Sequence, residues 1–169
     1  GTTMRMVADK SGLSVEKLEA EYSDKQQILN ELIGFHLNVH EGIRVFTRTY
    51  PDFSPLQSFQ REWELMCKYL SSYQEIIQAF KQYESELDTW IKERIKRNRD
   101  QDVELLEKAC DIKELPRVDV ASLESVLYGT LKNLILGSPN QSPGSDFTAI
   151  PDKVFSMILA PLICRSEVL

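Results

Sequence analysis

Apolar residues recur every three or four positions along almost the whole chain, and this spacing is what most restricts its fold. Such spacing gathers apolar side chains on one side of an α-helix, whereas a half-buried strand alternates at every second residue. Strand-like alternation is absent. Glycine, which weakens helix interiors, accounts for only 7 of the 169 residues. The sequence therefore predicts an all-α protein.

The first 30 residues predict two short helices joined by a tight turn. Thr2 or Thr3 can cap the first helix, because a hydroxyl oxygen accepts a hydrogen bond from an N–H group of the first turn. Gly12 supplies the left-handed residue that ends this helix, and Ser14 caps the next one. A helix-turn-helix places its second helix in a DNA major groove. The same elements also occur in helical hairpins that never touch DNA.

This segment resembles the DNA-binding signature of TetR-type transcriptional regulators. The shared pattern consists of Thr2-Thr3, Val7-Ala8, Gly12-Leu13-Ser14, Leu18, Tyr22, Lys25 and Ile28-Leu29. The resemblance implies a helix-turn-helix head over residues 1–30 and a helical effector-binding and dimerisation domain over residues 31–169. Members of this family have a further helix ahead of the motif. We expect that helix to have been cut off, or left out, of a sequence that begins at Gly1.

The resemblance also implies that a homodimer contacts a double-stranded DNA operator through the head. The positions carried over for contact are Thr3, Arg5, Ser14, Val15, Lys17 and Lys25. The two reading helices of such a dimer lie one DNA turn apart, about 34–36 Å, and match a palindromic operator. An effector would shift the third helix like a lever and change that distance.

The predicted reading helix, residues 14–22, is unusually acidic. It carries Glu16, Glu19 and Glu21 against Lys17 alone. Phosphate contacts dominate protein–DNA affinity, so acidic side chains near the backbone oppose binding. An alternative is therefore a TetR-like co-regulator or protein-interaction module that has lost DNA binding and uses this helix against a basic partner protein.

The chain as a whole is acidic, with a net charge of −6, so it lacks a global basic footprint for nucleic acid. Charges are screened over about 10 Å at 0.1 M salt, so the local charge of the head, and not the net charge of the chain, decides whether DNA can bind. The basic run KERIKRNR, residues 92–99, is interpreted as the solvated end of a helix rather than a nucleic-acid patch.

The body is expected to consist of amphipathic helices, beginning with a long third helix over residues 24–49. Ser23 and Gln26 have the spacing of a capping box at its start. Its apolar stripe is made of Ile28, Leu32, Phe35, Val39, Ile43 and Phe46. Later helix starts are marked by Ser54-Pro55, Ser72, Asp119 and Pro151. Pro161 is expected to bend or end the last helix.

The last two predicted helices are apolar on more than one side. The residues concerned are Leu127, Leu131, Leu134, Phe155, Ile158, Leu159 and Leu162. A helix with a wide apolar arc needs a second surface to cover it. This pattern indicates a two-fold dimer built as a four-helix bundle, which the resemblance also implies.

Eleven aromatic residues lie between Phe35 and Trp90, in the middle of the chain. A TetR-like body encloses its effector with the middle helices, so this enrichment fits a small apolar or aromatic effector. The predicted lining residues are Phe59, Trp63, Phe80, Tyr83 and Trp90. The competing interpretation, that these aromatic side chains simply fill a helical core, stays open.

No motif predicts catalysis or a cofactor. A nucleophile elbow, a phosphate-binding glycine loop and a paired carboxylate set are all absent from the sequence. His36 and His40 lie one helical turn apart, but without a third ligand they are interpreted as structural or pocket-lining groups and not as a metal site. The sequence has an odd number of cysteines, namely Cys67, Cys110 and Cys164, which indicates reduced thiols in a cytoplasmic protein. No apolar run approaches the roughly 20 residues of a membrane span.

Overall fold

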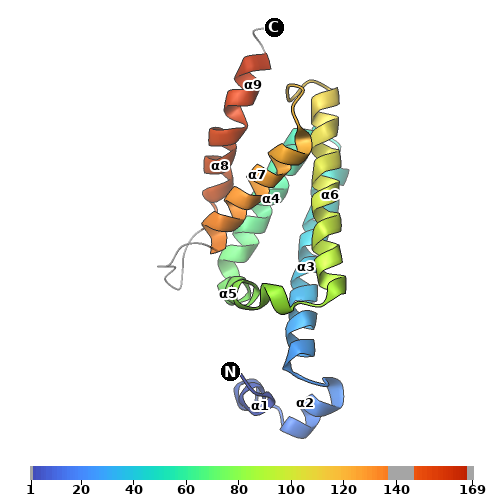
Figure 1. The fold of residues 1–169 in the computed structure, drawn as a ribbon, viewed down its shortest axis with the longest axis vertical. Helices are drawn as coiled ribbons and strands as arrows, with labels where there is room; N and C mark the ends of the chain where they lie inside the picture. The colour runs from blue at the N-terminus through green and yellow to red at the C-terminus, as the bar shows by residue number, and fades with distance from the viewer. Residues whose placement is uncertain (1, 137–146, 167–169) are drawn as a thin grey trace.

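The computed structural model describes residues 2–136 and 147–166, and every element in them is a helix (Figure 1). In chain order these are α1 (Met4–Ser11), α2 (Val15–Glu21), α3 (Lys25–Thr49), α4 (Pro55–Ser72), α5 (Gln74–Tyr83), the short 3-10 helix η1 (Glu84–Glu86), α6 (Thr89–Asp111), α7 (Val120–Leu136), α8 (Ile150–Ile158) and α9 (Ala160–Ser166). The predicted all-α class is confirmed. No described helix is both long enough and apolar enough to cross a membrane.

Helices α1 and α2 form a small head at one end of the molecule, joined to the body by α3 (Figure 1). Thr3 caps α1, because its hydroxyl oxygen accepts a hydrogen bond from the Met6 N–H at 3.3 Å. Ser14 caps α2 in the same way, accepting from the Lys17 N–H at 3.2 Å. Gly12 lies between them with φ +71°, a left-handed conformation that favours glycine. Each of these caps was predicted from the sequence.

The start of α3 differs by one residue from the predicted capping box. Asp24 is the N-cap, and its carboxylate accepts from the Gln27 N–H at 2.9 Å. The Gln27 side chain in turn accepts from the Ser23 N–H at 2.7 Å. The Ser23–Gln26 pairing is therefore wrong, because a carboxylate one residue later takes the cap.

The inward side of α3 carries polar as well as apolar residues, and half of its predicted apolar stripe, Leu32, Phe35 and Phe46, is exposed. Phe35 is 58% exposed and Phe46 55% exposed. The buried residues of α3 are Asn30, Ile33, Gly34, Arg44 and Thr47. This orientation opposes the usual amphipathic pattern. It is possible because partners on α4 and α6 neutralise the buried charge.

The later helices begin and end mostly where capping and proline predict. Ser54 and Gln57 form a reciprocal capping box at the start of α4, with Pro55 at the first helical position. The Asp119 carboxylate caps α7 by accepting from the Ser122 N–H at 3.2 Å. Helix α8 ends at Ile158, and Pro161, which has no N–H to donate, lies in the first turn of α9. The cap expected at Ser72 is wrong, because α4 continues through Ser72 and α5 starts without a side-chain cap.

The basic run of residues 92–99 lies near the start of α6 and not at its carboxyl end, so the expected position at the end of a helix is wrong. The helix continues beyond this run to Asp111. Two of its arginines pair with other helices. Arg94 contacts Glu41 on α3 at 2.7 Å, and Arg99 contacts Glu124 on α7 at 2.6 Å.

The main apolar core of the body joins α4, α6, α7 and α8, with Leu106 and Leu127 fully buried. A smaller cluster ties α3 to the start of α6 through Ile33 and Ile91. Beside it, the Trp90 ring lies so close to Gly34 that a Cβ there would be 2.7 Å from the indole. Helix α5 closes the end of the body nearest the head (Figure 1).

Candidate functional site

The body contains a partly open cavity of about 180 Å³ bounded by α3, α4, α5, α6 and α7. Its apolar lining consists of Ile33, Leu37, Trp63, Met66, Leu70, Ile77, Phe80, Ile95 and Ile135. Its polar lining consists of His36, His40, Arg44, Tyr69, Asn98, Arg99, Asp102, Tyr128 and Lys132. An apolar cavity with a few converging polar groups is the usual form of a small-molecule site.

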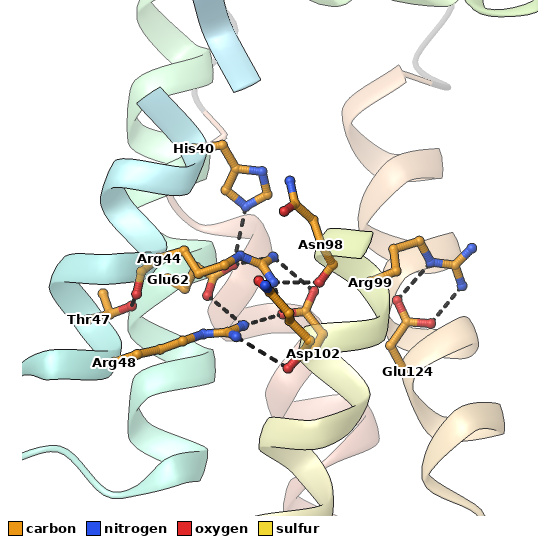
Figure 2. A network of polar contacts seen from close by, with 10 residues as sticks. His40, Arg44, Thr47, Arg48, Glu62, Asn98, Arg99, Asp102 and Glu124 are labelled. Atoms are coloured by element: carbon orange, nitrogen blue, oxygen red, sulfur yellow. Dashed lines mark hydrogen bonds and ion pairs between the residues drawn. The ribbon is translucent and has the colours of Figure 1, made fainter. Parts of the chain in front are cut away.

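A buried set of ion pairs lies at one end of this cavity and joins α3 to α4 and α6 (Figure 2). We call Arg44, Arg48, Glu62 and Asp102 the charged cluster. The Arg44 guanidinium contacts Glu62 at 2.7 Å and Asp102 at 3.0 Å. Arg48 contacts the same two carboxylates at 3.2 Å and 2.7 Å. The cluster therefore connects three helices through two arginines and two carboxylates.

The two carboxylates of the charged cluster respond differently to burial. Burial opposes ionisation of Glu62, but the His40 hydrogen bond and the charges of Arg44 and Arg48 together hold its pKa below the ordinary value. Burial dominates at Asp102 and raises its pKa to about 7, even though Arg44 lies beside it. Glu62 is thus ionised at neutral pH, whereas Asp102 gains or loses its proton close to neutral pH.

His40 contacts the charged cluster and also lines the cavity. Its Nε2 is 3.2 Å from Glu62 Oε1. Burial lowers the pKa of His40, which keeps the imidazole neutral at pH 7. A neutral ring that donates from Nε2 to the carboxylate keeps Nδ1 as an acceptor. Figure 2 shows that the second ring nitrogen is turned away from Glu62.

A second polar group lies on the wall formed by α3 and α4. The Tyr69 hydroxyl is hydrogen-bonded to His36 Nδ1, and the Tyr69 and Tyr73 rings lie 4.6 Å apart. Burial lowers the pKa of His36, so this ring is also neutral at pH 7. The histidines one turn apart thus line the cavity, and among the described residues no three His, Cys, Asp or Glu side chains gather as a metal site would need.

On the α7 side, each cation that lines the cavity has a carboxylate partner. Arg99 binds Glu124 through Nε and Nη2, at 2.9 and 2.6 Å, and lies 4.5 Å from the centre of the Tyr128 ring. Lys132 contacts Glu84 at 2.6 Å. These pairs leave little unmatched positive charge for a ligand.

The cavity includes two of the five aromatic residues predicted to bind the ligand. Trp63 and Phe80 line it. Phe59 is 1% exposed and packs against Phe155 in the main core. Trp90 lies on Gly34 outside the cavity, and Tyr83 is not among the lining residues. Aromatic enrichment alone therefore did not separate lining residues from core residues.

Sequence reasoning missed most of the polar lining, including Arg44, Asn98 and Asp102. One signal was present on α3, where His36, His40, Arg44 and Arg48 recur every four residues. Residues four apart share a helix face. A long helix with such a polar face, when buried, must meet acidic partners. The identity of those partners was not visible in one helix.

The residues predicted to contact DNA all lie in the head or at the first residue of α3. Arg5, Lys17 and Lys25 are exposed, and Val15 is half-buried. Thr3 and Ser14 are both N-caps, with their hydroxyl oxygens already accepting backbone hydrogen bonds. The three glutamates of the acidic reading helix are likewise exposed.

The residues predicted at a dimer interface divide into two groups. Leu127, Leu131, Phe155 and Leu159 are at most 4% exposed and fill the core of the protomer itself. Ile158 and Leu162 pack partly against that core, and Leu134 is 42% exposed. The same helices also expose Val126 at 53% and Met157 at 66%.

Of the comparisons with known proteins, the one with solved structures identifies the fold. No protein-family model matches the sequence, and no curated protein matches it either. The structure is similar to that of the TetR family transcriptional regulator PfmR from Thermus thermophilus, with a TM-score of 0.79 and 17% identity over 94% of this chain and 88% of that one. It is also similar to the ketosteroid transcriptional regulator KstR2 of Mycobacterium tuberculosis, with a TM-score of 0.77 and 16% identity over 95% of this chain and 84% of that one. The chain therefore has a TetR-like fold, as the resemblance implied.

Proposed function

We propose that this protein is a ligand-responsive transcriptional regulator of the TetR type, acting as a cytoplasmic homodimer on palindromic DNA. One observation carries the proposal. Helix α3 begins at Lys25, directly after the head, and the same helix lines the cavity from Ile33 to Arg44. A ligand that moves α3 would therefore move the head.

The proposed mechanism requires two positions of α3 with different affinities for the ligand. A ligand that binds both positions equally changes nothing, however tightly it binds. The charged cluster suits this role because Arg44 and Arg48 of α3 are held by carboxylates of α4 and α6. Shifting α3 changes those contacts, and a ligand against Arg44 would favour one arrangement.

The proposed DNA contacts are the exposed Arg5, Lys17 and Lys25, with Thr3, Ser14 and Val15 positioning the helix starts. Backbone N–H groups at helix starts and basic side chains are the common partners of phosphates. The proposed dimer contacts are the exposed apolar residues of α7 and α8, namely Val126, Leu134 and Met157. Exposed apolar residues on neighbouring helices favour association with a second copy.

A gel-shift titration against DNA from upstream of the protein's own gene tests this function. We expect specific retardation, because TetR-like heads read operators in the major groove. Lys17→Ala should weaken binding and reduce the dependence of log K on log salt by about one unit. Lys153→Ala, an exposed lysine of α8, is the matched control and should leave both unchanged.

The second candidate is a co-regulator that binds a basic partner protein through α2. The observation in its favour is the exposure of Glu16, Glu19 and Glu21 on that helix. A hydrogen bond with its own backbone N–H and one with the Ser14 hydroxyl lower the pKa of Glu16, so this charge persists at neutral pH. Absence of specific retardation even at low salt would favour this candidate over the first.

A further inference from the structure

We propose that the cavity binds a small uncharged alcohol or phenol, with its hydroxyl group at the His40 end and its carbon skeleton in the apolar part. This inference rests on the proposed function, because it names the class of effector for the same cavity. Three properties of the cavity carry it: its size, the pairing of its charges, and the hydrogen-bonding groups left over.

The size of the cavity fits about one substituted ring. Its volume is about 180 Å³. A cavity of about 150 Å³ lined by Leu, Ile and Phe holds one benzene molecule. The apolar walls here, such as Leu37 on α3 and Ile95 on α6, are of the same kind.

The pairing of the charges that face the cavity disfavours an ionic ligand. Arg44 is paired with Glu62 and Asp102, Arg99 with Glu124, and Lys132 with Glu84. A carboxylate entering the cavity would lose its hydration and meet these partner carboxylates, and Arg44 already has the ionised Glu62 as a partner. An ammonium group would meet the arginines. Burying an unpaired charge is strongly unfavourable, so an uncharged ligand is favoured.

The hydrogen-bonding groups that remain fit a hydroxyl group. The neutral His40 ring donates from Nε2 to Glu62, which leaves Nδ1 as an acceptor. The indole N–H of Trp63, the Nδ2 group of Asn98 and the Nε–H of Arg44 belong to lining residues, are buried and have no hydrogen-bond partner. A hydroxyl group can donate to a ring nitrogen and accept from an N–H, whereas a carbonyl or ether oxygen can only accept.

Three matched compounds test the ligand class on the whole natural protein by isothermal titration calorimetry. We expect 4-ethylphenol to bind at least about tenfold more tightly than ethylbenzene, because a lost buried hydrogen bond leaves polar groups unmatched. We expect no measurable binding of 4-ethylbenzoate. Equal binding of ethylbenzene, tighter binding of 4-ethylbenzoate, or no binding of any of the three would overturn the proposal.

Two further measurements test where the compound binds. Leu37→Trp fills the cavity and should abolish binding of 4-ethylphenol, while Leu32→Trp, on the exposed side of α3, should preserve it. Unchanged binding by a folded Leu37→Trp variant would overturn the proposal.

In the natural protein, the indole N–H resonance of Trp63 should shift on binding while that of Trp90 stays in place. Trp63→Phe assigns the signal, and a shift of Trp90 alone would contradict the location.

These results are separable from the proposed function. DNA retardation is measured without any ligand, so it can succeed while 4-ethylphenol fails to bind, which would overturn only the ligand class. Binding of 4-ethylphenol at the cavity without any DNA retardation would support the ligand class and count against the regulator.

Discussion

The head and the body bury very different amounts of side chain. Among the described residues of α1 and α2, Ala8 and Leu18 are the buried ones, one on each helix. The described part of the body has three apolar clusters and a buried set of ion pairs. Helices of eight and seven residues are marginal in isolation. The head is therefore expected to open locally at lower free energy than the body, which suits a part that must be repositioned.

Removal of Glu62 should have the largest effect, because it tests whether the charged cluster holds the body together. Glu62→Ala leaves Arg44 and Arg48 with an uncompensated buried charge. We expect the free energy of unfolding in urea to fall by about 3–5 kcal/mol. Glu64→Ala, which breaks an exposed pair with Arg61, is the control and should lower it by about 0–1 kcal/mol. Equal effects of the two variants would contradict this role of the cluster.

Paired leucine substitutions compare the two regions directly. Leu106→Ala in the body should lower the global free energy of unfolding by about 2–5 kcal/mol, because Leu106 is fully buried. Leu18→Ala should speed amide hydrogen exchange in α1 and α2 while leaving exchange in α4 and α6 unchanged. Faster exchange throughout the body in Leu18→Ala would show that head and body unfold as one unit.

The close packing of α3 on α6 can be tested at Gly34. A methyl group there would lie 2.7 Å from the Trp90 ring. Gly34→Ala should lower stability by about 1–3 kcal/mol, as overpacking does, and shift the tryptophan fluorescence to longer wavelength if the ring moves outwards. Gly42→Ala is the control on the same helix, with nothing within 4 Å of its Cβ, and should raise stability by about 0.5–1 kcal/mol. Stabilisation by both variants would contradict the close approach.

The pH dependence of stability tests Asp102. Its pKa is raised to about 7 in the folded state, so the folded protein holds a proton that the unfolded chain releases. This contribution is complete below about pH 4 and is lost as pH rises through 7, with a slope of at most about 1.4 kcal/mol per pH unit. His40, whose pKa is lowered, gives the opposite slope. We therefore expect the natural protein to lose stability relative to Asp102→Asn between about pH 4 and 7. A constant difference would contradict the raised pKa.

Local signals predicted the head and most helix ends well. Thr3, Ser14 and Ser54 all cap the helices that they were expected to cap. Each cap depends on a hydrogen bond to a backbone N–H three residues away, so a short window of sequence contains both partners. Where two capping residues are adjacent, as at Ser23 and Asp24, that window does not decide between them.

The candidate site was predicted less completely. The middle helices were expected to enclose it, and Trp63 and Phe80 do line the cavity. Arg44 was not expected there, because a charged residue is buried only when partners neutralise it. One of those partners, Asp102, is 58 residues away along the chain.

The sequence by itself determined the helical class, the positions of most helix ends and the resemblance of the head, because these depend on periodicity and on contacts within one turn. Tertiary structure decided which side of α3 faces inwards, which aromatic residues line the cavity and which leucines fill the protomer core. Periodicity defines a stripe on a helix but not what covers it. Arg44 lies inside, and Phe46 outside, because Glu62 and Asp102 meet the arginine on other helices.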